Sequence, residues 1–139
     1  MCGTTRPGHF EGVMTVLLKL FNITKPSSAY FGEKDYQQYL IVKNMVDAFF
    51  MPINVVPVPT MREPDGLAMS SRNLRLLPEE REIAPLFNKV MTWAETAKDA
   101  KAKLFEMGIK VDYLKDIGGR RYGAVFIGAV RLIDNVPIR

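Results

Sequence analysis

Cysteine and histidine are almost absent from this sequence of 139 residues, which contains one of each, Cys2 and His9. A single cysteine excludes an intramolecular disulfide, and one Cys with one His cannot assemble a Cys/His zinc site. We therefore expect no metal site within the chain. Long apolar runs are also missing, because stretches such as residues 49–59 fall short of the ~18 apolar residues of a membrane span. With no signal-peptide pattern, the expected location is the cytoplasm, away from membranes.

Clusters of basic residues are scarce too. The chain carries 19 basic and 15 acidic residues, a net charge of +4, yet only Arg120 and Arg121 are adjacent basic residues. No basic run interleaved with aromatic residues appears, which argues against a nucleic-acid partner. The excess positive charge suits a phosphate-bearing small molecule better. Hydrophobic residues make up 47% of the sequence, which is typical of one soluble domain or two small ones.

The N-terminal part of the chain alternates between helix and strand patterns. Apolar residues recur at helical spacing in residues 11–21 and 36–49, and short β-rich runs occupy residues 28–31 and 53–58. Such alternation predicts a parallel sheet with crossover helices, although two strands are too few to be stable alone. We therefore expect this sheet to be the end of a larger one. Apolar positions expected to lack part of their cover are Val16, Tyr30, Val55 and Val56.

A polar, turn-rich segment at residues 60–73 follows the second strand. A loop of this length without regular structure usually serves a function. It also separates two halves of the chain. The sequence therefore predicts a first domain over residues 1–73 and a second over residues 74–139.

The C-terminal part begins with helical patterns and ends with β patterns. Pro78 can start a helix, Pro85 either kinks that helix or marks its true start, and Gly108 can end a second helical piece. Residues 110–116 and 122–133, on either side of a glycine pair, are rich in β-branched and aromatic residues. They predict a small antiparallel sheet.

The first candidate site lies where the strand at residues 28–31 ends and the next helix begins. Gly32 permits close backbone approach, Lys34 adds positive charge, and Asp35 can accept hydrogen bonds from ribose hydroxyls. Strand ends of parallel sheets are common ligand sites. The alternative is an ordinary helix start with acidic first-turn residues and a solvated lysine.

The second candidate site is the end of the long loop, residues 69–73. Two hydroxyls and a guanidinium, from Ser70, Ser71 and Arg72, can hold a triphosphate, and Arg can follow charge that develops on transferring phosphoryl oxygens. The alternative is equally simple, since serines before a helical segment often serve as caps.

The third candidate is the pair Arg6 and His9, which together could bind a carboxylate. The alternative is a structural role, because a lone histidine is more often a structural residue than a catalyst. The His-x-Gly-His signature of adenylyl-transferring enzymes is absent, because its first histidine would fall at Arg6.

Taken together, residues 6–10 (RPGHF), 31–38 (FGEKDYQQ), 61–73 (MREPDGLAMSSRN) and 131–135 (RLIDN) resemble the pantothenate synthetase (pantoate–β-alanine ligase) family in order and spacing. The resemblance corresponds to the C-terminal half of that family. It implies an α/β fold, in which the end of a Rossmann-like nucleotidylyl-transferase parallel sheet is followed by a small α+β C-terminal domain.

The resemblance also implies a reaction. Family members condense pantoate with β-alanine in an ATP-dependent, AMP-forming reaction through a pantoyl-adenylate, with Mg²⁺ carried by ATP. The expected ligands are therefore ATP, pantoate and β-alanine, and the expected macromolecular partner is a second copy of the chain or a missing N-terminal half. Two alternatives remain: a non-catalytic nucleotide-binding or docking fragment, and another adenylate-forming nucleotidylyl transferase.

Site residues follow from the resemblance position by position. Lys34, Ser71 and Arg72 would be catalytic, and Gln38, His9 and Arg6 would bind pantoate. The residues that would contact ATP are Gly32, Glu33, Lys34, Asp35, Met61, Met69, Ser70, Ser71 and Arg72.

Overall fold

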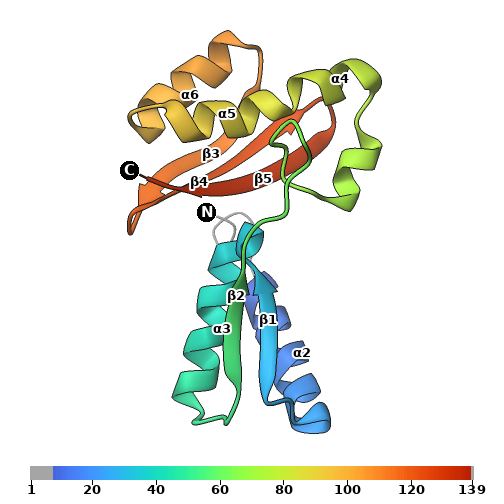
Figure 1. Ribbon diagram of the computed structural model, residues 1–139, viewed down its shortest axis with the longest axis vertical. Helices are drawn as coiled ribbons and strands as arrows, with labels where there is room; N and C mark the ends of the chain where they lie inside the picture. Colours follow the sequence, from blue (N-terminus) through green and yellow to red (C-terminus); the bar gives the residue numbers. More distant parts are fainter. Residues whose placement is uncertain (1–7, 139) are drawn as a thin grey trace. The chain divides into compact units, whose positions relative to one another are not determined.

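The computed structural model describes residues 8–138 and divides the chain into two compact units, Met1–Pro59 and Thr60–Arg139 (Figure 1). The loop at residues 60–73, which the sequence placed with the first domain, groups with the second unit. The reason is a side-chain contact: Arg62 in this loop pairs with Asp134 of the C-terminal sheet. Arg6 lies outside the described residues, so its predicted role is not addressed by the structure.

The first unit contains two helices and a two-stranded parallel sheet. Helix α2 spans His9–Thr24, strand β1 Ser28–Gly32, helix α3 Tyr36–Ala48 and strand β2 Asn54–Val58, with a short 3-10 turn at Glu33–Asp35. The strands pair from Ser28 opposite Asn54 to Gly32 opposite Val58. The predicted order of helix, strand, helix and strand is confirmed. Glu33 and Asp35 belong to the separate turn rather than to the first turn of α3.

One face of this sheet carries the core of the first unit. Phe21, Val42, Met45 and Val46 are buried, and the odd-numbered strand residues Ala29, Phe31 and Val55 pack against them, together with Ile53 just before β2. Because side chains alternate along a strand, the even-numbered residues face the opposite side.

That opposite side has little cover. Tyr30 on this side is 71% exposed, and Val16 on α2 is 56% exposed, which confirms the expectation of missing cover for these two residues. The expectation is wrong for Val55, which packs against the core on the other face, and Val56 is half-buried. Leu20 of α2 and Phe49 after α3, which belong to the apolar patterns of residues 11–21 and 36–49, are also exposed.

The second unit is a three-stranded antiparallel sheet with helices packed on it. Its strands are β3 (Lys110–Ile117), β4 (Arg120–Ile127) and β5 (Val130–Pro137), in that order across the sheet, and its helices are α4 (Pro78–Ile83), α5 (Pro85–Trp93) and α6 (Ala97–Glu106). A 3-10 turn at Ser71–Arg75 precedes α4. Figure 1 shows α5 and α6 lying over one face of this sheet.

Proline and glycine decide where these elements break. Of the two alternatives predicted for Pro85, the structure has a helix start, because α4 ends at Ile83 and Pro85 occupies the first turn of α5. The single run predicted over residues 122–133 is wrong, because a second tight turn at Gly128 (φ 54°) separates β4 from β5. The predicted antiparallel sheet is confirmed, with Gly118 and Gly119 (φ 57° and 73°) forming the first turn.

A buried arginine joins the sheet of the second unit to its helices. Arg121 is 1% exposed and donates to the main-chain oxygens of Met91 (3.0 Å) and Ala94 (2.6 Å), at the end of α5. It also forms a bidentate pair with Asp116 (2.8 and 3.1 Å), whose carboxylate accepts from the Ala97 N–H (2.8 Å) at the start of α6. The hydrogen bond from Arg121 lowers the pKa of Asp116.

Two helices end in the same hydrogen-bond motif but with different residues in its left-handed position. After α6, Gly108 (φ 74°) donates to Phe105 O, and the next residue donates to Leu104 O. After α3, Phe50 (φ 51°) holds the equivalent position, donating to Asp47 O at 3.2 Å, although it is 93% exposed. This position favours glycine or asparagine, and a bulky residue there is strained.

We predict that Phe50→Asn stabilises the first unit by about 1 kcal/mol, because a left-handed conformation costs a bulky residue roughly 1–2 kcal/mol. Amide hydrogen exchange at the buried Val42 reports the opening of this unit. Phe49→Asn is the matched control, since Phe49 is also exposed but has φ −96°. Equal exchange in the two variants would show that Phe50 is not strained.

Candidate functional site

The carboxyl ends of β1 and β2 lie at one edge of the parallel sheet, since Gly32 is paired with Val58. Four of the predicted ATP-contacting residues follow this edge: Gly32, and then Glu33, Lys34 and Asp35 in the 3-10 turn. Gly32 has φ −64°, so its backbone does not require glycine, but the space where a Cβ would lie is open. An open backbone at a strand end is a feature of ligand sites in α/β sheets.

A surface groove of about 580 Å³ lies beside this region, between the first turns of α2 and the start of α3. His9, Gly12 and Val16 of α2 line it together with Gln38 of α3. The structure therefore brings His9 and Gln38 together, two residues to which the family resemblance gave the same ligand. Its walls are apolar, and the imidazole of His9 and the amide of Gln38 are its polar side-chain groups.

In the second unit, the loop at residues 60–73 folds back on itself as a short hairpin. Arg62 and Ala68 form an antiparallel bridge, and the Met69 N–H donates to Met61 O at 2.9 Å. A turn at its tip is closed by the Gly66 N–H, which donates to Glu63 O at 2.8 Å. Met61 and Met69, predicted separately as ATP contacts, are thus neighbours with exposed side chains.

The segment after this hairpin presents two of the predicted phosphate ligands to solvent. Ser70 caps the 3-10 turn, with its Oγ accepting from the Arg72 N–H at 3.3 Å. Ser70 is thus a helix cap, which is the alternative that the sequence offered for these serines. Ser71 and Arg72 have exposed side chains on the first turn of this 3-10 segment.

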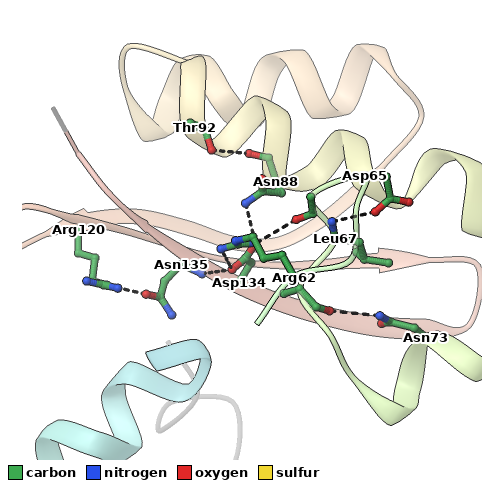
Figure 2. Close-up of polar contacts among 11 residues, drawn as sticks. Arg62, Asp65, Leu67, Asn73, Asn88, Thr92, Arg120, Asp134 and Asn135 are labelled. Carbon is green, nitrogen blue, oxygen red and sulfur yellow. Dashed lines mark hydrogen bonds and ion pairs between the residues drawn. The ribbon is translucent and has the colours of Figure 1, made fainter. Parts of the chain in front are cut away.

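A buried carboxylate holds the hairpin on the C-terminal sheet (Figure 2). Asp134 has a side chain that is 2% exposed, and it accepts two hydrogen bonds from Arg62, at 2.7 and 3.0 Å. Asn88 Nδ2 (3.0 Å) and the Asn135 N–H (2.8 Å) complete its coordination. Arg62 also donates to Gly66 O at 3.1 Å and so connects the hairpin tip to the same anchor.

A second charged group braces the hairpin from α4. Arg81 donates to Glu63 Oε2 at 2.8 Å and pairs with Asp65 Oδ2 at 2.6 Å. The pKa of Glu63 is lowered by hydrogen bonds from Asn73 and Arg81, and that of Asp65 by hydrogen bonds from Arg81 and the Leu67 N–H. Both carboxylates are therefore stabilised in their charged form.

Asn73 closes this network. Its Nδ2 donates to Glu63 Oε1 (3.1 Å) and to Ala68 O (3.2 Å), and its Oδ1 is buried with no partner in the described part of the chain. Sequence reasoning gave no role to Asn73, Arg62 or Asp134, although the quoted motifs contain them. A single sequence carries no signal that would pair Arg62 with Asp134.

Within residues 8–138, no group of three or more His, Cys, Asp or Glu side chains is placed to hold a metal ion. The same part of the chain has no helix with the length and apolarity needed to cross a bilayer.

A family model described as pantoate-beta-alanine ligase matches residues 1–137. This chain belongs to the pantoate-beta-alanine ligase family. Pantothenate synthetase of Bdellovibrio bacteriovorus is 57% identical over 136 residues, which are 98% of this chain and 54% of that protein. The protein of the same name from Legionella pneumophila strain Corby is 52% identical over 135 residues, 97% of this chain and 54% of that protein.

Solved structures of the pantoate-beta-alanine ligase family agree with this assignment. Pantothenate synthetase from Thermus thermophilus matches with a TM-score of 0.87 and 39% identity, over 97% of this chain and 58% of that one. The ligase from Francisella tularensis, complexed with beta-gamma ATP and beta-alanine, matches with a TM-score of 0.89 and 40% identity, over 99% and 53%.

The pantoate-beta-alanine ligase assignment confirms the predicted family and fold class. The chain spans about half the length of the curated relatives it matches, in agreement with a C-terminal half. The described unit with a parallel sheet and the unit with an antiparallel sheet correspond to the expected end of a Rossmann-like domain and the small α+β domain.

We predict that the Arg81 pairs make the second unit more stable above pH 4 than below it. Both carboxyls have a lowered pKa in the folded state, so their contribution is complete above their ordinary values of about 4 and is lost as the pH falls through the lowered values. Urea unfolding at pH 7, 4 and 3, followed by Trp93 fluorescence, measures the effect.

Arg81→Met should flatten this acid-side loss, because the carboxyls then return toward their ordinary pKa. Arg75→Met, a substitution of an exposed arginine on the adjacent 3-10 turn, should leave it unchanged. Parallel pH dependence in the parent and in Arg81→Met would refute the assignment.

Proposed function

We propose that this chain provides the C-terminal half of a pantothenate synthetase, which condenses pantoate with β-alanine at the expense of ATP in the cytoplasm. The observation that carries the proposal is the anchored hairpin, which presents Ser71 and Arg72 to solvent from a base fixed by Asp134. Membership of the ligase family supplies the reaction, and the ATP and beta-alanine named with the Francisella structure support these ligands.

Residues of each unit are proposed as ATP contacts. In the first unit, Lys34 neutralises phosphate charge and Asp35 accepts from the ribose hydroxyls beside the open backbone of Gly32. In the second unit, Met61 offers its backbone to adenine, and Ser71 and Arg72 contact the outer phosphates. Mg²⁺ enters with ATP as part of the substrate.

The remaining predicted ATP contacts lie next to the residues proposed above. Glu33 lies in the 3-10 turn beside Lys34, Met69 pairs with Met61, and Ser70 caps the segment that carries Arg72. For the second substrate, the groove with His9 and Gln38 accommodates pantoate, whose carboxylate and hydroxyls match an imidazole and an amide. Arg6 completes the proposed pantoate ligands.

The proposed chemistry requires charge neutralisation more than a base. A pantoate carboxylate oxygen attacks the α-phosphorus of ATP. The bond between the α-phosphorus and the oxygen that bridges it to the β-phosphorus breaks, and pyrophosphate leaves. The β-alanine amine then attacks the acyl carbon of pantoyl-adenylate, loses a proton and displaces AMP. Because a carboxylate is already ionised at pH 7, the cations Lys34 and Arg72 act by stabilising charge on the phosphates.

A non-catalytic nucleotide-binding or docking fragment is the second candidate. The observation that favours this candidate is length, because the match covers only 54% of the Bdellovibrio protein. The two candidates share ATP binding and differ in turnover. We expect the isolated chain to release little or no AMP from ATP, pantoate and β-alanine, and turnover comparable with a full-length relative would contradict this expectation.

ATP binding tests the proposed site directly. In calorimetric titrations with Mg·ATP, we predict that Lys34→Ala and Arg72→Ala each weaken binding at least tenfold, because a hydrogen bond to a charged group contributes about 1.5–3 kcal/mol. Arg75→Ala is the matched control, since Arg75 lies on the same 3-10 segment and is also exposed. It should stay within about threefold of the parent.

Absence of ATP binding by the parent, or equal effects of Arg72→Ala and Arg75→Ala, would refute the proposed ATP site. Titration with inorganic pyrophosphate and with a set of other nucleotides, using the same variants, separates recognition of the triphosphate from recognition of adenine. Screening other carboxylic acids for ATP–pyrophosphate exchange distinguishes another adenylate-forming transferase.

A further inference from the structure

One side chain anchors the 3-10 segment Ser71–Arg75, which carries Arg72. Asn73 is the buried residue of this segment, whereas its neighbours Arg72 and Leu74 are exposed. Hydrogen bonds within a 3-10 turn have poor geometry, so a short turn of this kind depends on its side-chain contacts for its position. The way in which Asn73 is held therefore decides where the backbone of Arg72 lies.

The amide group of Asn73 ties this segment to both arms of the hairpin (Figure 2). Its Nδ2 donates to Glu63 Oε1 at 3.1 Å, on the first arm, and to Ala68 O at 3.2 Å, on the second. The other carboxylate oxygen of Glu63 accepts from Arg81 of α4. Ala68 is bridged to Arg62, whose side chain pairs with a carboxylate of β5. One nitrogen atom thus connects the 3-10 segment with supports on α4 and on β5.

The amide oxygen of Asn73 makes no such contact. Oδ1 is buried and has no hydrogen-bond partner among the residues that the structure describes. An unpaired buried acceptor destabilises the folded state, so each one in a folded protein calls for an explanation. Stability of the fold alone does not explain an asparagine at this position. What the residue contributes is the pair of hydrogen bonds from Nδ2, which fix the segment beside Arg72.

We propose that Asn73 is a positioning residue for ATP, which holds the Arg72 guanidinium where it meets the outer phosphates. Asn73 is 8% exposed and uses its Nδ2 within the hairpin, so it acts through Arg72 rather than by touching the nucleotide. Orientation matters because a guanidinium binds a phosphate through two parallel N–H groups. The inference rests on the proposed function and gives a role to a residue that the proposed ATP contacts do not include.

Calorimetric titration of the full chain with Mg·ATP tests the positioning role. Asn73→Leu replaces the amide by an apolar group of similar size, and Asn73→Asp replaces the donor by a carboxylate that faces Glu63. Each should weaken ATP binding about tenfold or more, because the Arg72 guanidinium loses its fixed orientation. Leu74→Asp is the matched control for the added charge, since Leu74 is the next residue and is 88% exposed. It should stay within about threefold of the parent, because solvent screens an exposed charge.

A double-mutant cycle supplies a readout that a merely structural role would not move. If Asn73 acts through Arg72, adding Asn73→Leu to Arg72→Ala weakens ATP binding by no more than about twofold beyond Arg72→Ala alone. A residue that only stabilises the fold would instead multiply its effect with that of Arg72→Ala, to about a hundredfold in total.

Urea unfolding followed by Trp93 fluorescence establishes that the variants are folded during the titrations. Multiplicative losses in the cycle would overturn the positioning role of Asn73, and so would unchanged ATP affinity in both Asn73→Leu and Asn73→Asp. Loss of folding in both variants would assign Asn73 to stability and would also contradict the proposal.

Failure of this proposal is distinguishable from failure of the proposed function. A parent chain that binds Mg·ATP and loses affinity in Arg72→Ala, but not in Asn73→Leu, would overturn the positioning role alone. A parent chain that does not bind Mg·ATP would overturn the proposed ATP site, and the positioning role with it.

Discussion

The bidentate pair between Arg62 and the buried Asp134 is the interaction on which the candidate site depends. A carboxylate with 2% exposure must be paired and hydrogen-bonded, and here Arg62, Asn88 and the Asn135 N–H all donate to it. The pair fixes the base of the loop at residues 60–73 on β5. The Arg62–Ala68 bridge and the exposed 3-10 segment at Ser71–Arg75 are therefore held at a fixed position on the second unit.

An ion pair with one buried partner contributes more to geometry than to net stability. Desolvation, chiefly that of Asp134, offsets much of the attraction, whereas the loss of Arg62, whose side chain is 27% exposed, would leave the Asp134 carboxylate buried without its cation. The hairpin therefore has one arrangement that satisfies Asp134. A more exposed set of ion pairs joins Arg81 to Glu63 and Asp65 at the other side of the loop. These pairs make the stability of the second unit depend on pH but do not fix the position of the loop on the sheet.

Local features of the fold could be predicted from the sequence, and long-range ones could not. Periodicity predicted α2, α3 and both parallel strands, because each depends on its own residues. The division at Pro85 could not be predicted locally, because a proline can either kink a helix or start one. The turn at Gly128 was missed because the residue after this glycine is an alanine, which is not a typical turn residue. The Arg62–Asp134 pair joins residues 72 positions apart, and no local pattern in one sequence marks it. The exposed side of β1 was foreseen because two strands cannot cover themselves.

The most direct test of this account is the exchange rate of the Met69 amide, which donates to Met61 O across the hairpin, in Asp134→Asn. The substitution keeps the size of the side chain but removes the charge that holds Arg62. We expect Met69 exchange to rise at least tenfold, while Asp112→Asn, which breaks the more exposed pair with Arg131, leaves it unchanged. An unchanged Met69 amide in Asp134→Asn would contradict the central claim that this pair holds the loop in place.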